Sequence, residues 1–183
     1  MVPLLVRPAT ATEYDTIGAL TADVFERERL AGPAYVEILR DAPSRAALPN
    51  TELLVAVDGT ALLGAVTLCL PDCPWAQDAL PDEAEMRMLV VAPTERGSGV
   101  GAALVDACIQ RACAVGARRL VLSTKREMAA AQRLYLRLGF GRLPKRDRTP
   151  RPGLELLAYS LDLWPQDSSS DSPSHVSTTR SAS

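Results

Sequence analysis

The stretch of sequence that most constrains the fold runs from residue 85 to residue 101, EMRMLVVAPTERGSGVG. Its first half is an apolar run rich in long and β-branched side chains, as is typical of a strand, and Pro93 ends that run. Glycines then stand at alternate positions, 97, 99 and 101, and from Val100 onward apolar residues recur with helical spacing. The segment therefore predicts a strand, a glycine-rich loop and a helix, in that order.

Such a loop can bind a ligand that carries phosphates. The first turn of a helix has N–H groups without partners and a partial positive charge, and glycines let a ligand approach them because no Cβ intervenes. A dinucleotide fold would need G-x-G-x-x-G and an acid after the next strand, but the third glycine comes one residue early and Ser123 ends that strand. A nucleotide P-loop would need a lysine, and none follows. The loop therefore indicates another bulky anionic cofactor, or a tight turn without a ligand.

Composition bounds the remaining classes of function. The chain has 183 residues, of which 47% are hydrophobic, and this suits one domain with a sizeable core over residues 1–164. A net charge of -2 gives no basic footprint for nucleic acid. The apolar run at the start of the chain, in MVPLLVRPAT, is too short for a signal peptide, and no run of 18 apolar residues could span a membrane. We expect a soluble, cytoplasmic protein that binds neither nucleic acid nor membrane, and a monomer or a homodimer is left open.

The histidine and cysteine residues limit which catalytic groups and metal sites the protein can have. The only histidine, His175, lies in a Ser-rich tail (165–183) that we expect to be disordered, so no ordered histidine is available for a catalytic triad or a metal site. The four cysteines lack the paired C-x2-C spacing of a zinc site, and we expect free thiols and no bound metal. Acid–base chemistry must then come from carboxylates, tyrosines, lysines or cysteines.

The rest of the chain predicts further strands and helices. Strands are expected at 4–7, 51–57, 61–70, 120–122, 140–143 and 154–163, with Asp58-Gly59 as a hairpin turn. Helices are expected from Thr10 or Thr12 to Leu30, over 33–40, over 100–116 and before Gly139. Loops are expected at 41–50, 71–83 and 144–153. Trp75 in the second loop either packs on the core or lines a pocket, and the basic third loop either faces solvent or contacts a ligand.

Two motifs together resemble a known family. The loop from Arg96 to Gly101 fits R/Q-x-x-G-x-G/A, and the segment from Ala131 to Phe140 fits A-x-x-L-Y-x-x-L-G-F, with room between them for a helix, a turn and a strand. Residues 85–141 thereby resemble the general control N-acetyltransferase (GNAT) superfamily. This resemblance implies a mixed α/β (α+β) fold, with a largely antiparallel central sheet of six or seven strands, splayed middle strands and helices on both faces.

The resemblance also implies an activity. It suggests an N-acetyltransferase that moves the acetyl group of acetyl-CoA to a primary amine, on a small molecule or a peptide, by direct attack in a ternary complex without a metal. The alternative is a non-catalytic domain of the same fold that binds acyl-CoA as a sensor. Acetyl transfer requires a base for the ammonium group, a donor for the oxyanion and a proton for the departing thiolate.

Particular residues acquire roles from the resemblance. Tyr135 would give a proton or a hydrogen bond to the CoA sulfur, unless it is simply a core tyrosine. Glu85 would act as the general base, with Asp82, Glu83 or a water as alternatives. The cofactor would be bound by the strand amides of Leu89, Val90 and Val91, with Val90 facing the thioester oxygen, and by the loop of Arg96, Gly97, Ser98, Gly99, Val100 and Gly101.

Two further expectations concern neighbouring positions. Strand alternation should put Glu85, Arg87, Leu89 and Val91 on one face of the sheet. Met128 stands where many members of the superfamily have an asparagine that contacts pantetheine, and a thioether is only a weak acceptor. Ser123 stands where enzymes that acetylate ribosomal-protein N-termini often have an acid, which disfavours that class of acceptor.

Overall fold

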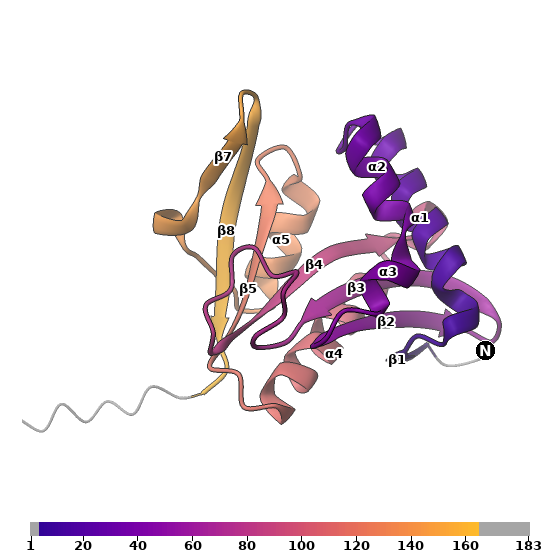
Figure 1. Ribbon diagram of the computed structural model, residues 1–183, viewed down its shortest axis with the longest axis horizontal. Helices are drawn as coiled ribbons and strands as arrows, with labels where there is room; N and C mark the ends of the chain where they lie inside the picture. Colours follow the sequence, from indigo (N-terminus) through magenta and orange to yellow (C-terminus); the bar gives the residue numbers. More distant parts are fainter. Residues whose placement is uncertain (1–3, 165–183) are drawn as a thin grey trace, which may run out of the picture.

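The computed structural model describes residues 4–164 (Figure 1). The predicted tail (165–183), including His175, lies outside the described residues. Within residues 4–164 no helix is long and apolar enough to cross a membrane, and no group of three or more His, Cys, Asp or Glu side chains could hold a metal ion. All four cysteines are free, as predicted.

The fold is one sheet with helices on both faces. The sheet has eight strands in the order β1-β2-β3-β4-β5-β8-β6, with β7 paired to β8. All pairs are antiparallel except the parallel pair β4 and β5. The strands are β1 Leu5–Pro8, β2 Thr51–Asp58, β3 Ala61–Cys69, β4 Glu83–Val91, β5 Arg119–Lys125, β6 Gly141–Arg142, β7 Arg148–Arg151 and β8 Leu154–Asp162. The predicted mixed, largely antiparallel sheet is confirmed, with eight strands over residues 4–164 in place of the six or seven expected, because β7 adds to β8 within the predicted loop 144–153.

Five α-helices cover the sheet. They are α1 Tyr14–Arg27, α2 Pro33–Arg40, α3 Ala42–Ala46, α4 Val100–Ala114 and α5 Ala129–Arg137. Buried side chains of α4 and α5 join one core cluster on the sheet, whereas those of α1, α2 and α3 join two clusters on its other face (Figure 1). Parallel β4 and β5 need a crossover between them, and α4 supplies it.

Three local predictions were wrong. The first helix ends at Arg27 rather than Leu30, because Arg29 adopts a left-handed conformation with φ of 55°. The predicted loop 41–50 contains α3, which is N-capped where Asp41 accepts a hydrogen bond from the Ser44 amide at 3.0 Å. The predicted basic loop 144–153 contains a 3₁₀ turn, Pro144–Arg146, and the strand β7.

A bulge interrupts β4. Thr67 of β3 pairs with Arg87, but Ala65, two residues earlier, pairs with Val90, so β4 holds one extra residue. That residue is Met88, whose φ of 53° is left-handed. The bulge reverses the alternation of side chains. The expectation that Glu85, Arg87, Leu89 and Val91 share a face is therefore wrong. Leu89 and Val91 pack on the side of the sheet that α4 and α5 cover. Arg87 lies on the other side, where it stacks on Trp75, which packs on α2.

The two middle strands separate beyond the first three residues of β4. Their parallel pairing runs only from Glu83 opposite Arg119 to Glu85 opposite Val121. Strand β4 continues to Val91 and β5 to Lys125 without further pairing between them, and Figure 1 shows the two strands diverging. The splayed middle strands that the resemblance implied are thus present, and they open a gap in the sheet.

Candidate active site

A cavity of about 370 Å³ lies at the gap between β4 and β5. Side chains from both strands, including Met86, Leu89 and Ser123, line its inner part, together with Tyr135 of α5. Residues of the connection between α1 and α2 and residues of the β7–β8 hairpin line its outer part. Figure 1 shows these two segments on opposite sides of the splayed strands. Strands, helices and a hairpin from distant parts of the sequence therefore converge on one space.

The predicted phosphate-binding loop leads from β4 to the N-terminus of α4. Gly99 is the N-cap residue, with a left-handed φ of 93°, and its lack of a side chain leaves the first-turn amides of α4 uncapped. Residues 96–99 are exposed. The Ser98 hydroxyl donates to the Glu95 carbonyl at 2.6 Å and so braces the turn from within. These exposed amides at a helix N-terminus fit the phosphates of an anionic cofactor.

The side chain of Arg96 has another partner. Its guanidinium forms an ion pair with Glu28, the residue that follows α1. Both side chains are well exposed, so the contact is weak and open to exchange with an anion. The loop is thereby joined to the start of the connection between α1 and α2, which also lines the cavity.

The hydrogen-bonding register of β4 decides which of its amides face the gap. The Ala92 amide donates to the Leu63 carbonyl of the neighbouring chain segment at 2.8 Å. Amides two residues apart on a strand point the same way, so the Val90 amide also faces β3, with which it is in register. The amides of Leu89 and Val91 face the open side. This register does not agree with the prediction that Val90 offers its amide to the gap.

Tyr135 is buried in the wall of the cavity. Its ring packs against Phe140 and Tyr159, with centroids 5.9 and 6.1 Å away. Burial, with a smaller contribution from the neighbouring Cys108, raises the pKa of the Tyr135 phenol well above its usual value. The raised pKa keeps the phenol protonated at neutral pH. Within residues 4–164 its hydroxyl has no hydrogen-bond partner, so it is free to donate.

Glu85 also lines the cavity, but its carboxylate is already engaged. Its Oε2 accepts hydrogen bonds from the amides of Gln77, Asp78 and Ala79 at 2.6, 2.8 and 3.3 Å. Its Oε1 lies 3.5 Å from Nε of Arg87. Glu85 therefore fastens the loop 71–82 to β4, and only Oε1 is left without a main-chain donor.

Arg87 and Trp75 lie next to Glu85 and also join the loop 71–82 to β4. The Arg87 guanidinium donates to the Trp75 carbonyl and stacks on the Trp75 ring, 4.3 Å from its centroid. Arg45 lies over the same ring at 5.5 Å. Trp75 packs beside Val36, Leu39 and Met88 and does not line the cavity, so of its two predicted roles the structure supports packing on the core.

The comparisons with known proteins agree with this geometry. The model of the acetyltransferase (GNAT) family matches residues 19–140, which is more than half of the chain. This protein belongs to the GNAT family. No curated protein sequence gives a significant match.

Solved structures of GNAT proteins share the fold. A GNAT acetyltransferase from Desulfovibrio desulfuricans aligns with a TM-score of 0.69 at 20% identity, over 88% of this chain and 100% of its own. One from Staphylococcus aureus Mu50 aligns with a TM-score of 0.71 at 14% identity, over the same shares. YncA from Salmonella typhimurium, whose structure contains acetyl-CoA, aligns with a TM-score of 0.63 at 19% identity, over 90% of this chain and 96% of its own.

The two fallback bases lie elsewhere in this GNAT domain. Asp82 is exposed and paired with Arg118 at 2.6 Å. Glu83 is fully buried and bound by Arg146 at 2.5 and 3.1 Å and by the Leu80 amide at 3.0 Å. Neither carboxylate lines the cavity, so neither can take a proton from a substrate there.

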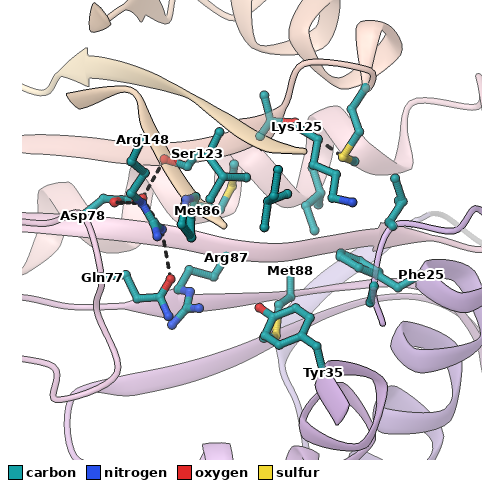
Figure 2. A pocket seen from close by; sticks show the side chains of 18 of the residues that line it. Phe25, Tyr35, Gln77, Asp78, Met86, Arg87, Met88, Ser123, Lys125 and Arg148 are labelled. Atoms are coloured by element: carbon teal, nitrogen blue, oxygen red, sulfur yellow. Dashed lines mark hydrogen bonds and ion pairs between the residues drawn. The ribbon is translucent and has the colours of Figure 1, made fainter. Parts of the chain in front are cut away.

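A polar cluster that sequence reasoning missed lies on the hairpin side of the GNAT cavity (Figure 2). The Ser123 hydroxyl donates to Oδ2 of Asp78 at 2.6 Å, and Nε of Arg148 lies 2.8 Å from Oδ1 of the same carboxylate. Arg148 also donates to Oε1 of Gln77 at 2.9 Å. The basic composition of 144–153 was the only signal in the sequence, and it could not say that β7 pairs with β8 and turns Arg148 inward.

Met128 lies at the N-cap of α5 and lines the cavity. The Thr124 hydroxyl donates to its sulfur at 3.5 Å. A thioether offers no donor and only a poor acceptor, so the prediction stands that this position does not replace an asparagine side chain.

Proposed function

We propose that this GNAT protein is an N-acetyltransferase that moves the acetyl group of acetyl-CoA to a primary amine by direct attack in a ternary complex. The observation that carries the proposal is the gap between β4 and β5, which holds a cavity with Tyr135 in its wall, while the exposed glycine loop lies between β4 and α4. Membership of the GNAT family and the acetyl-CoA in the YncA structure support the choice of cofactor.

Acetyl-CoA would supply a thioester that is activated for attack by an amine. The amides of Gly97 to Gly101 would bind its phosphates, because they lie at the positive end of the α4 dipole and the loop before the helix is exposed. The amides of Leu89 and Val91 would bind the pantetheine arm as an added strand would, because they face the open side of β4.

Three groups of this chain would serve the chemistry. The Leu89 amide, beside the cavity, is our choice for the oxyanion donor in place of Val90. The Tyr135 hydroxyl would donate a proton to the leaving sulfur, since burial keeps it protonated. Oε1 of Glu85 would accept the proton of the amine, directly or through a water, because Oε2 is held by main-chain amides.

The test combines binding and turnover. Calorimetric titration would measure CoA affinity, and a thiol reagent would measure release of free CoA when the protein is mixed with acetyl-CoA and a panel of amines. Tyr135→Phe removes only the hydroxyl, which has no partner among residues 4–164. We expect it to lower turnover by about 100-fold or more, since general acid catalysis contributes about 10²- to 10⁴-fold, with CoA affinity nearly unchanged. Equal turnover in both proteins would exclude the role of Tyr135.

Glu85 needs two variants because it has two functions. Glu85→Gln keeps an oxygen to accept the amides of the 71–82 loop, whereas Glu85→Ala loses both the base and the anchor. We expect Gln to fold like wild type but to lower turnover by about 100-fold or more, because an amide cannot accept the proton of the amine. Full activity of Glu85→Gln would assign the proton to a water held by main chain instead.

The same titrations address the alternative of a regulatory sensor. A sensor would bind CoA tightly yet release no thiol with any amine in the panel. Absence of any affinity for CoA or its acyl esters would overturn the enzyme and the sensor together.

A further inference from the structure

The charged side chains around the cavity are not balanced. Six ionisable groups line it apart from tyrosines, and four of them are cationic. The two carboxylates belong to Asp78 and Glu85, and the four cations are Arg87, Lys125, Arg148 and Arg151. A space of about 370 Å³ therefore has an excess of positive charge, which favours an anionic group in whatever enters it.

The carboxylates are already satisfied and offer little to a cationic substrate. Oε2 of Glu85 accepts three main-chain hydrogen bonds. Both oxygens of Asp78 are engaged, one by the Ser123 hydroxyl and the other by Arg148. An amine with several positive charges would have to displace these partners.

Two of the cations, by contrast, have no counter-charge. Within residues 4–164, neither Lys125 nor Arg151 forms an ion pair or a side-chain hydrogen bond. Lys125 ends β5 and pairs with Leu156 of β8, and Arg151 ends β7 and pairs with Leu154. Figure 2 shows the Lys125 side chain directed away from β5 toward Phe25.

Arg151 stands at the mouth of the cavity. Its guanidinium reaches toward the opposite wall, since a Cβ built on Gly32 would lie 3.9 Å from Arg151 Nη1. Gly32 precedes α2, so this one side chain spans from the β7–β8 hairpin to the connection between α1 and α2. A group that enters between the hairpin and α2 must pass this guanidinium.

The remainder of the outer wall is apolar. It consists of Phe25, Leu30, Tyr35, Met88, Leu154 and Leu156. In Figure 2, Tyr35, Met88 and Phe25 lie together on the side opposite Arg148. Such a wall can hold a hydrocarbon or aromatic group of modest size.

We infer that the acceptor is an amine that also carries a carboxylate and an apolar side group, of the kind found in an apolar amino acid, and that Arg151 binds its carboxylate. This inference rests on the proposed acetyl transfer. A guanidinium is the side chain best suited to a carboxylate because it can donate two parallel hydrogen bonds. Arg151 is thereby a specificity residue rather than a catalytic one.

The experiment separates recognition from catalysis. Binding of N-acetyl-L-phenylalanine and of N-acetyl-L-phenylalaninamide, which differ only in the carboxylate, would be measured by calorimetry on the CoA-saturated protein. Wild type, Arg151→Gln and Arg27→Gln would be compared, because Arg27 is an exposed arginine that does not line the cavity. Binding needs no turnover, so a failure of the proposed catalysis would leave this result readable.

We expect wild type and Arg27→Gln to bind the acid about tenfold more tightly than the amide, as for a hydrogen bond to a charged group at a partly exposed site. Arg151→Gln should reduce that preference to about twofold or less, with CoA affinity unchanged. The preference for acid over amide should fall by the same factor, from wild type to Arg151→Gln, in kcat/KM for L-phenylalanine and L-phenylalaninamide. Dividing the preference of wild type by that of the variant cancels the different basicity of the two amines. Equal binding of acid and amide by wild type, or an unchanged preference in Arg151→Gln, would overturn the inference.

Discussion

The neighbouring carboxylates Asp82 and Glu83 allow a direct test of what burial does to an ion pair. Both are bound by arginine, but Glu83 is fully buried whereas the Asp82 side chain is 56% exposed. Glu83 is bound by Arg146, by the Leu80 amide and by Arg119 at 3.4 Å, and it thereby holds the 3₁₀ turn before β7 against the start of β4. We predict that Glu83→Gln destabilises the protein far more than Asp82→Asn.

The magnitudes follow from the burial of the partners. Removing one member of a buried pair costs about 3–5 kcal/mol because the other charge is left without compensation. The side chains of Arg146 and Arg119 are 24% and 18% exposed, so water can recover part of this loss. We therefore expect Glu83→Gln to lower the free energy of unfolding by about 2–3 kcal/mol and Asp82→Asn by less than about 1 kcal/mol.

The assay is chemical and thermal unfolding at pH 7. At about 2–4 °C per kcal/mol for a domain of this size, Tm should fall by about 5–10 °C in Glu83→Gln and by less than about 4 °C in Asp82→Asn. Glu83→Gln should also raise KM for the acceptor but not weaken CoA binding, because the hairpin carries Arg148 and Arg151 whereas the phosphate loop is elsewhere. Equal losses of stability in the two variants would refute the reasoning from burial.

The pH dependence supplies an independent check on Glu83. Burial alone would raise its pKa, but the hydrogen bonds from Arg146 and the Leu80 amide outweigh burial, and the pKa lies below its usual value. A carboxyl with a lowered folded pKa stabilises the protein above its unfolded pKa of about 4.3 and loses that effect as pH falls through the folded pKa. The difference between wild type and Glu83→Gln should thus be constant from about pH 7 to 5 and shrink below about pH 4. A difference that persists undiminished at pH 2 would mean that packing, not charge, is responsible.

Three further predictions concern other parts of the fold. Gly99→Ala and Gly59→Ala both place a side chain at a left-handed φ, 93° and 58°, and each should lower the free energy of unfolding by about 1–2 kcal/mol. Only Gly99→Ala should also weaken CoA binding, about tenfold by calorimetry. Equal CoA affinity of the two variants would show that the loop does not bind the cofactor. In Gly18→Ala the new Cβ would lie 2.0 Å from the carbonyl oxygen of Arg40, the last residue of α2. Tm should therefore fall by several degrees, and KM for the acceptor should rise as α2 shifts. An unchanged Tm would contradict the close packing of α1 on α2. Hydrogen bonding to Arg7 lowers the pKa of Glu13 to about 2, and Arg7→Ala should return it toward about 4 in an NMR titration. The stability lost in that variant should be visible above about pH 4 and vanish as pH falls to about 2; a Glu13 pKa that stays near 2 would show that the Thr10 amide alone holds it.

Part of the site could be predicted because its determinants are local in sequence. The glycine loop and the segment around Tyr135 are short motifs whose backbone demands are written in consecutive residues, so their elements were predicted close to their observed bounds. Of the three elements that differed, α3 and the end of α1 depend on single local features, the Asp41 cap and the left-handed Arg29, that the pattern of apolar residues does not reveal. The third, β7, is a strand only because β8 supplies the pairing partner.

The sequence by itself therefore determined the family, the order of the central elements and the position of the glycine loop, since periodicity, glycine placement and motif spacing act over a few residues. Tertiary structure alone decided the direction of charges and amides. One extra residue at Met88 turns Leu89 and Val91, rather than Val90, toward the gap. Three amides from a distant loop engage Glu85, and strand pairing brings Arg151 to the mouth of the cavity. These features depend on which segments meet in space, because a hydrogen bond or an ion pair is fixed by its partner as much as by the residue that makes it.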